Sequence, residues 1–275
     1  MPAPNARVLR DDAHRTLHVV LLSHSDALTP ATSSSNRHRI ARCLLWGGLA
    51  IHVTIAVVAA AVGRVPTPGS DFDNFYEIGT KPGRPYVDFA VEYPVATAQA
   101  FRLLAPAAGT RERFGVTLVI VSAVADIAVA AALYWGWGIE AVVCYLLIVA
   151  PVADLFFLRT DMWSTALATL GVAAWHRARP TAAALGFAIG AAFKLWPLTF
   201  LPLLLVPVCA RRAVPLATAA AAGLAILGWW LWIAGPAGLY QVLTFRGARG
   251  WEIESIVGGV MMAGDLSSMR LEHGA

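Results

Sequence analysis

Long apolar blocks constrain this chain more than any other feature of its sequence. The clearest blocks cover residues 43–62, 114–134, 139–158 and 213–234. A helix needs about 20 apolar residues to cross about 30 Å of hydrocarbon. The chain as a whole is 58% hydrophobic and only 14% charged, which leaves too little polar surface for a soluble domain. We therefore predict an all-α integral membrane protein.

Two further apolar segments are shorter or interrupted. Residues 162–175 form the shorter one, and residues 181–210 contain Pro197, Pro202 and Pro207. Proline breaks helices, so we expect 181–210 to form two short helices that meet near Lys194, with a re-entrant pair as the alternative. Together with the longer blocks, these segments predict a polytopic helical bundle with about seven transmembrane helices.

Clustered arginines predict the orientation of the bundle. Three groups flank apolar segments: Arg37, Arg39 and Arg42; Arg177 and Arg179; Arg211 and Arg212. Loops rich in Lys and Arg stay in the cytoplasm, so we expect these ends and the N-terminus to be cytoplasmic in a multi-pass plasma-membrane protein. The net charge of +4 then reflects topology and lipid contact, and we expect no nucleic-acid partner.

Because each crossing changes the side of the membrane, the same arginine groups also divide the chain into three parts. Residues 1–41 are expected to be a disordered cytoplasmic tail, 42–234 the transmembrane domain, and 235–275 an extracytoplasmic segment. A large first extracytoplasmic loop, 64–113, contains a predicted amphipathic helix over 93–108. The short segments 159–161 and 194–197 are expected on the same side as this loop.

Acidic and aromatic residues alternate in the first loop. The acidic residues are Asp71, Asp73, Asp88 and Glu92, and Tyr86 lies among them. Carboxylates beside a bilayer can act as a general base, as cation ligands or as acceptors for sugar hydroxyls. The alternative is an aromatic belt with solvated acids.

Basic residues in the later extracytoplasmic segments are candidates for binding phosphate. These are Arg159, Lys194 and Arg246, because cationic side chains pair with phosphate oxygens. The alternatives are a local ion pair of Arg159 with Asp161, a snorkelling Lys194 and an ordinary charged loop around Arg246. Asp126 lies within an apolar block, where an acid has either a functional role or a partner on a neighbouring helix.

Common catalytic and nucleotide motifs are absent. The sequence contains no Walker A loop, no strand-associated GxGxxG, no HExxH and no GxSxG. No metal-binding constellation stands out, and we predict neither a metal nor a cofactor.

The first loop resembles that of family 87 glycosyltransferases, bacterial polyprenyl-phosphate-mannose-dependent mannosyltransferases of the GT-C superfamily. The resemblance lies in Asp71 through Tyr76, Gly83 through Phe89 and Glu92-Tyr93-Pro94, and it continues through Arg159-Thr160-Asp161, Lys194-Leu195-Trp196-Pro197 and Arg246-Gly247. The family usually has proline where this chain has Val95, and its members continue through further helices. The resemblance therefore implies a C-terminally truncated relative with a GT-C-like fold.

The resemblance also implies an activity and roles for individual residues. Mannose would move, with inversion, from a polyprenyl phosphate to a glycan or glycolipid hydroxyl outside the membrane. Asp71 would be the base, with Asp73 as the runner-up. Lys194, Arg246 and Arg159 would hold the donor phosphate, and Tyr86, Asp88 and Glu92 would shape the loop or the acceptor site. The competing hypotheses are a polytopic transporter and an inactive remnant of such an enzyme.

Overall fold

The computed structural model describes residues 32–62, 71–152, 157–206 and 213–245. The chain forms two compact units, 1–44 and 45–275. Among the described residues, the first unit contains only the start of helix α2 (Thr32–Val62). Every regular element in the described ranges is an α- or 3₁₀-helix, which confirms the predicted all-α membrane fold.

Within the described ranges, three helices are long and apolar enough to cross a bilayer. They are α2, α5 (Arg111–Trp137) and α10 (Ala213–Phe245). The 27 residues of α5 extend over about 40 Å at about 1.5 Å per residue. These helices correspond to three of the predicted blocks.

The remaining apolar segments form shorter helices. They are α6 (Ile139–Val149), η2 (Ala150–Val152), α8 (Asp161–His176), α9 (Pro180–Phe193) and the 3₁₀ segment η3 (Trp196–Leu205). An α-helix of 11 to 16 residues rises about 16–24 Å, less than the hydrocarbon thickness. The expected break near Lys194 is confirmed, because α9 ends at Phe193 and η3 begins at Trp196. The number of crossings stays a prediction.

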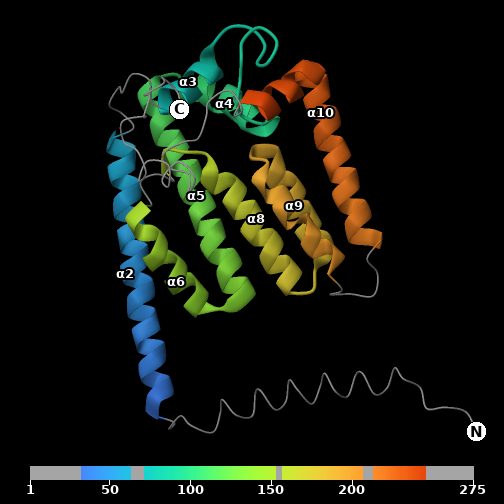
Figure 1. Ribbon diagram of the computed structural model, residues 1–275. Helices are drawn as coiled ribbons and strands as arrows, with labels where there is room; N and C mark the ends of the chain where they lie inside the picture. The colour runs from blue at the N-terminus through green and yellow to red at the C-terminus, as the bar shows by residue number, and fades with distance from the viewer. Residues whose placement is uncertain (1–31, 63–70, 153–156, 207–212, 246–275) are drawn as a thin grey trace, which may run out of the picture. The chain divides into compact units, whose positions relative to one another are not determined.

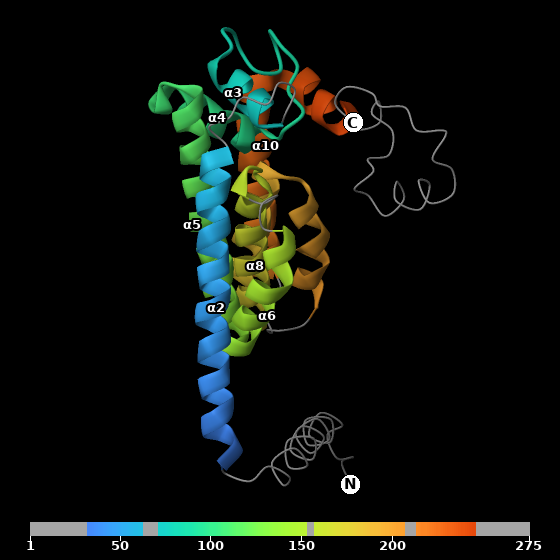
Figure 2. The ribbon, with the colours of Figure 1, turned by 90° about the vertical axis from the view of Figure 1, so that its left-hand side faces the viewer.

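Segments expected on one side of the membrane lie at one end of the second unit. Figure 1 shows α5 and α8 running away from one end of this unit, whereas α9 runs back toward it. The starts of α5 and α8 and the end of α9 therefore meet near helices α3 (Asp71–Thr80) and α4 (Val95–Ala108), which Figure 2 also shows at this end. We call this the α3–α4 end.

Helices α8 and α9 pack closely because small residues line their contact. A Cβ on Gly186 would lie 2.8 Å from the Leu167 carbonyl oxygen and 2.9 Å from the Gly171 Cα. The ring of Phe187 occupies the space beside Gly171, and its side chain is fully buried. Such close backbone approach is typical of helix association in membranes, where small residues replace the hydrophobic effect as the source of packing.

Helices α3 and α4 form a compact aromatic cap. Phe75 of α3 stacks on Phe101 of α4 with ring centroids 4.7 Å apart, and both are buried. The amphipathic helix predicted over 93–108 is present as α4. The sequence predicts a loop over residues 71–76, and the structure has helix α3 there, in agreement with the helical spacing of Phe72, Phe75 and Tyr76.

Helix α10 bends sharply where the sequence predicts the end of the last membrane block. Gly235 adopts φ 63°, a conformation that favours glycine, and Pro236 follows it. The last helical segment of α10 therefore turns across the α3–α4 end (Figure 1). Gln241 of this segment accepts a hydrogen bond from the Val91 backbone N–H at 3.2 Å. The bend therefore brings the end of α10 into contact with the loop that precedes α4.

One boundary differs from the sequence prediction. Helix α2 begins at Thr32, whereas residues up to 41 were predicted to be disordered. No glycine or proline occurs between Pro30 and Gly47, so nothing local stops the helix once it leaves the apolar block. The predicted boundary after residue 234 coincides with the kink at Gly235, and a separate helical segment follows it to Phe245.

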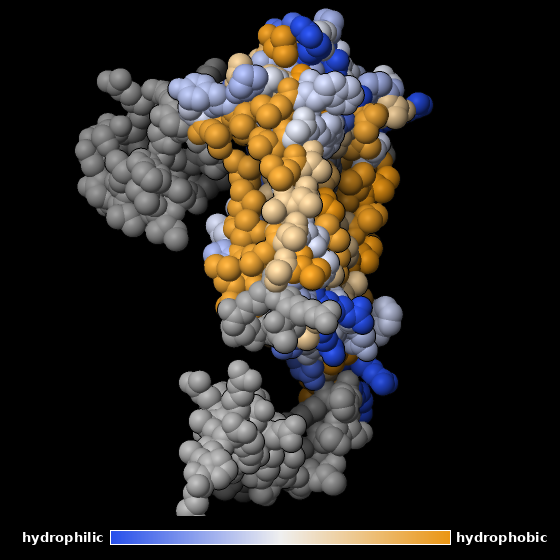
Figure 3. Space-filling view, turned by 90° about the vertical axis from the view of Figure 1, so that its right-hand side faces the viewer, coloured by the Kyte–Doolittle hydropathy of each residue, from blue (hydrophilic) through white to orange (hydrophobic). Residues whose placement is uncertain are grey.

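The surface agrees with a membrane setting. Figure 3 shows hydrophobic residues covering the middle of the face that carries α10, with polar residues gathered toward both ends. Large apolar side chains such as Trp232, Leu224 and Tyr240 are exposed on this helix. Lipid is the environment that makes such exposure favourable.

Candidate functional site

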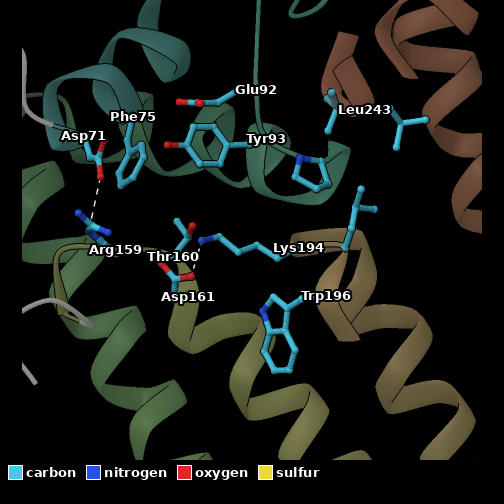
Figure 4. A pocket seen from close by; sticks show the side chains of 13 residues that line it. Asp71, Phe75, Glu92, Tyr93, Arg159, Thr160, Asp161, Lys194, Trp196 and Leu243 are labelled. Carbon is cyan, nitrogen blue, oxygen red and sulfur yellow. Dashed lines mark hydrogen bonds and ion pairs between the residues drawn. The ribbon is translucent and has the colours of Figure 1, made fainter. Parts of the chain in front are cut away.

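A pocket of about 330 Å³ opens at the α3–α4 end (Figure 4). It is lined by parts of α3, the loop before α4, the turn before α8, the α9–η3 junction and the last segment of α10. Its ionisable and hydroxyl side chains come from segments far apart in sequence: Asp71, Glu92, Tyr93, Arg159, Thr160, Asp161 and Lys194. The pocket thus gathers four of the sequence candidates, Asp71, Glu92, Arg159 and Lys194, from more than one hundred positions of the chain.

Asp71 occupies the first position of α3. The Phe72 and Phe75 side chains bury the inner face of this helix, which leaves the Asp71 side chain 51% exposed at the pocket. Its Oδ2 lies 3.4 Å from Nε of Arg159. The carboxylate is therefore accessible and faces a cation from another element.

The Arg159–Asp161 turn is held by the helices beneath it. Ser122 of α5 is fully buried, and its hydroxyl donates to the Arg159 carbonyl at 3.3 Å. The Trp163 indole N–H donates to the same hydroxyl at 3.2 Å. This chain of hydrogen bonds positions both Arg159 and the start of α8.

Lys194 reaches the pocket because α9 stops just before it. Thr97 of α4 donates its hydroxyl to the Phe193 carbonyl at 2.7 Å, and Lys194 itself is extended, with φ −148° and ψ 143°. Its ammonium group pairs with the Asp161 carboxylate. Trp196 then anchors the next segment through an indole hydrogen bond to the Ser164 hydroxyl at 3.1 Å.

Glu92 lies on the opposite wall of the pocket. Its Oε1 accepts a hydrogen bond from the Asn74 amide of α3 at 3.3 Å, and Figure 4 shows its side chain beside Tyr93. The structure thus brings Asp71, Glu92, Arg159 and Lys194 together in one pocket.

Asp73 does not line the pocket. Its Oδ1 accepts a hydrogen bond from Nε of Arg111 at 2.6 Å, and this guanidinium also lies 4.6 Å from the centre of the Phe72 ring. The Asp73–Arg111 pair therefore joins α3 to the start of α5.

Asp88 and Tyr86 shape the loop between α3 and α4. The Asp88 Oδ2 accepts a hydrogen bond from the Arg84 backbone N–H at 2.6 Å. The Tyr86 hydroxyl donates to the Tyr93 carbonyl at 2.6 Å, and burial raises the pKa of Tyr86 above its usual range. Both side chains hold the loop that carries Glu92 and Tyr93. Arg246 lies outside the described residues.

The charged side chains in the pocket include two ion pairs, Asp71 with Arg159 and Asp161 with Lys194. Three carboxylates, from Asp71, Glu92 and Asp161, face two cations, from Arg159 and Lys194. The side chains of Arg159 and Lys194 are 36% and 20% exposed. Partly solvated pairs of this kind contribute little net stability, so an anionic ligand can displace one carboxylate at modest cost.

A second group of polar residues lies inside the bundle. Asp126 of α5 receives hydrogen bonds from His52 of α2, with Nδ1 to Oδ2 at 3.0 Å, and from the Tyr145 hydroxyl of α6. His52 Nε2 also lies 3.0 Å from the Leu146 carbonyl oxygen. The possibility that Asp126 pairs with a neighbouring helix is confirmed. Its partners, His52 and Tyr145, were missed, although a histidine within an apolar block was the available signal.

Sequence reasoning also left two pocket residues without their observed roles. Asp161 was considered only as a local partner of Arg159, and in the structure it binds Lys194 across two helices. Thr160 was given no role and lines the pocket. Among the described residues, no group of three or more His, Cys, Asp or Glu side chains is arranged to hold a metal ion.

The fold and the site define a helical membrane protein with a charged pocket at one end of its bundle. Compared with protein families, with curated proteins and with solved structures, the chain matches none of them.

Proposed function

We propose that this protein is a membrane glycosyltransferase. It transfers mannose from a polyprenyl-phosphate donor to a hydroxyl of a glycan or glycolipid at the extracytoplasmic face of the plasma membrane. The observation that carries the proposal is the meeting of the Asp71 carboxylate with Arg159 and Lys194 in one partly exposed pocket at an end of the bundle. The resemblance of the first loop to family 87 enzymes supplies the donor and the sugar.

The pocket provides the groups that such a transfer needs. The acceptor oxygen attacks the anomeric carbon of the sugar and forms the new glycosidic bond with inversion, while its proton passes to the Asp71 carboxylate. The bond between the anomeric carbon and the phosphate oxygen breaks, and the polyprenyl phosphate leaves with the electron pair. Lys194 and Arg159 lie where they can stabilise the charge that develops on the phosphate.

Asp71 is a better candidate for the base than Asp73. Asp71 lines the pocket and its side chain is about half exposed, whereas Asp73 is bound by the Arg111 guanidinium at 2.6 Å. A general base must come within hydrogen-bond reach of the proton that it removes. Glu92 lies across the pocket, where it can orient the acceptor hydroxyl.

The test is a transfer assay on the full chain in proteoliposomes. The donor is a radiolabelled mannosyl polyprenyl phosphate and the acceptor is a mannoside glycolipid. Asp71→Asn is expected to lower the transfer rate about 10²–10⁴-fold, the usual contribution of a general base. Asp73→Asn is the matched control from the same helix, and it should retain transfer within about tenfold of the unsubstituted protein.

Two results would count against the proposal. Transfer that survives Asp71→Asn unchanged would remove Asp71 as the base. Absence of transfer together with uptake of solutes into the vesicles would favour the transporter, which is the second hypothesis from the sequence.

A further inference from the structure

The Thr160 hydroxyl is the least explained polar group in the pocket. Thr160 is 1% exposed, and its Oγ1 has no hydrogen-bond partner. Hydroxyls that are buried in proteins are almost always paired. Figure 4 shows the Thr160 side chain between the Asp71–Arg159 and Asp161–Lys194 pairs. An unpaired hydroxyl at this place in a pocket indicates a partner that enters with a ligand.

Thr160 also occupies a special position relative to α8. It precedes the first residue of this 16-residue helix, yet its side chain makes no capping hydrogen bond. Threonine at this position ordinarily caps the helix by accepting from an amide of the first turn. The first amides of a helix lack a partner one turn earlier, and they favour negative charge. In α8 the Trp163 amide is bound to the Thr160 carbonyl at 3.2 Å, so the donors meant here are the amides of Asp161 and Met162. The start of α8 and the Thr160 hydroxyl therefore offer donors to the same kind of ligand.

Lys194 is the third component. Its ammonium pairs with Asp161, the first residue of α8, and its side chain lies beside Thr160 in Figure 4. When Lys194 leaves Asp161, the carboxylate keeps some stabilisation, because the helix dipole stabilises a negative charge in the first turn of a helix. The cation can thus move to a ligand while Asp161 keeps a favourable environment.

We propose that Thr160 Oγ1, the first amides of α8 and Lys194 form a binding site for a phosphate group, and that Lys194 exchanges Asp161 for the phosphate when the ligand binds. The inference rests on the proposed function, since it identifies where the donor phosphate is held. The two can be tested separately, because phosphate binding is measured without any transfer reaction.

The experiment measures binding of farnesyl phosphate to the full chain in detergent by isothermal titration calorimetry. Thr160→Val removes the hydroxyl and keeps the side-chain shape, and it is expected to weaken binding about tenfold, as expected for the loss of a hydrogen bond to a charged group. Thr160→Ser keeps a hydroxyl and is expected to restore binding to within about threefold of the unsubstituted protein. Thr117→Val is the reference for a threonine outside the pocket lining, because the Thr117 hydroxyl donates to the Arg113 carbonyl of α5.

A stability measurement separates a ligand-binding role from a structural one. Thr97 is also fully buried, but its hydroxyl donates to the Phe193 carbonyl, so Thr97→Val should lower the unfolding temperature. Thr160→Val breaks no hydrogen bond within the protein, so its unfolding temperature should be unchanged or higher. A lowered unfolding temperature for Thr160→Val would show a structural hydroxyl and overturn the inference.

Further titrations identify the ligand group. If the phosphate group is what Thr160 recognises, Thr160→Val should weaken the binding of inorganic phosphate by the same factor as the binding of farnesyl phosphate. If the farnesyl chain adds affinity, inorganic phosphate should bind the unsubstituted protein more weakly than farnesyl phosphate does. Farnesol, which lacks the phosphate, should show no dependence on Thr160. Binding of farnesyl phosphate that is equal in Thr160→Val and the unsubstituted protein would overturn the inference even if mannose transfer is observed. Thr160-dependent phosphate binding without transfer would support it and count against the proposed function instead.

Discussion

The pocket and the bundle interior use the same kinds of side chain in opposite ways. In the pocket, Asp71 is 51% exposed and pairs with Arg159 at 3.4 Å. In the interior, the Asp126 side chain is 12% exposed and is held by His52 and Tyr145. The first carboxylate can exchange its partner with solvent or ligand. The second has no solvent to replace a partner that it loses.

This difference assigns the two regions different tasks. Buried polar networks are costly unless every member is satisfied, and a satisfied network specifies one arrangement of the helices. The Asp126 network joins α2, α5 and α6 through three side chains and the Leu146 carbonyl. The pocket instead contains the unpaired Thr160 hydroxyl, and departures of this kind from the usual pairing are expected at functional sites.

The largest expected effect comes from breaking the interior network. Asp126→Leu leaves His52 Nδ1 and the Tyr145 hydroxyl without their shared acceptor, and it should lower the free energy of unfolding by about 3 kcal/mol. Equilibrium unfolding in mixed detergent–SDS micelles measures this change. Asp71→Asn is the control from the pocket, where the expected change is below about 0.5 kcal/mol.

If Asp126→Leu keeps full stability but loses transfer, the contrast between the two regions is wrong and Asp126 belongs to the functional site. If Asp71→Asn proves as destabilising as Asp126→Leu, the pocket pair is structural.

A smaller effect is expected where α2 approaches α6. Gly48 lies one helical turn before His52, and a Cβ at this position would lie 2.8 Å from the Leu146 Cβ. Gly48→Ala should therefore move α2 outward slightly and lower the free energy of unfolding by about 1 kcal/mol. Gly47→Ala is the matched control, because a Cβ there meets no atom within 4 Å. Equal stabilities for the two variants in the same micelles would show that α2 does not dock through this face.

The sequence predicted the helices well because apolar blocks and prolines are local signals. The break before Trp196 and the amphipathic helix over 93–108 were both recognised in this way. Helix α3 was missed because it is short, with 10 residues, and acidic. Its apolar residues favour a helix only once Phe75 packs against Phe101 of α4. Local patterns could not show that α4 would cover this face.

The sequence predicted which residues form the candidate site better than it predicted which of them pair with one another. The parity of membrane crossings placed Asp71, Glu92, Arg159 and Lys194 on one side of the membrane, and the structure places them in one pocket. The pairing of Asp71 with Arg159 joins residues far apart in sequence, and no spacing rule predicts such a contact. The sequence could not predict that the Thr160 hydroxyl is unpaired either, since this depends on which hydrogen-bond partners the folded turn brings within reach.

The account depends most directly on the side of the membrane that the pocket faces. Single cysteines would replace Asp71, Lys194 and Arg179 in a protein whose three native cysteines are changed to serine, and intact cells would be treated with a membrane-impermeant maleimide. The account predicts that positions 71 and 194 react in intact cells, whereas position 179, at the other end of α8, reacts only after the membrane is permeabilised. Labelling of 71 and 194 from opposite sides, or of both only after permeabilisation, would contradict it.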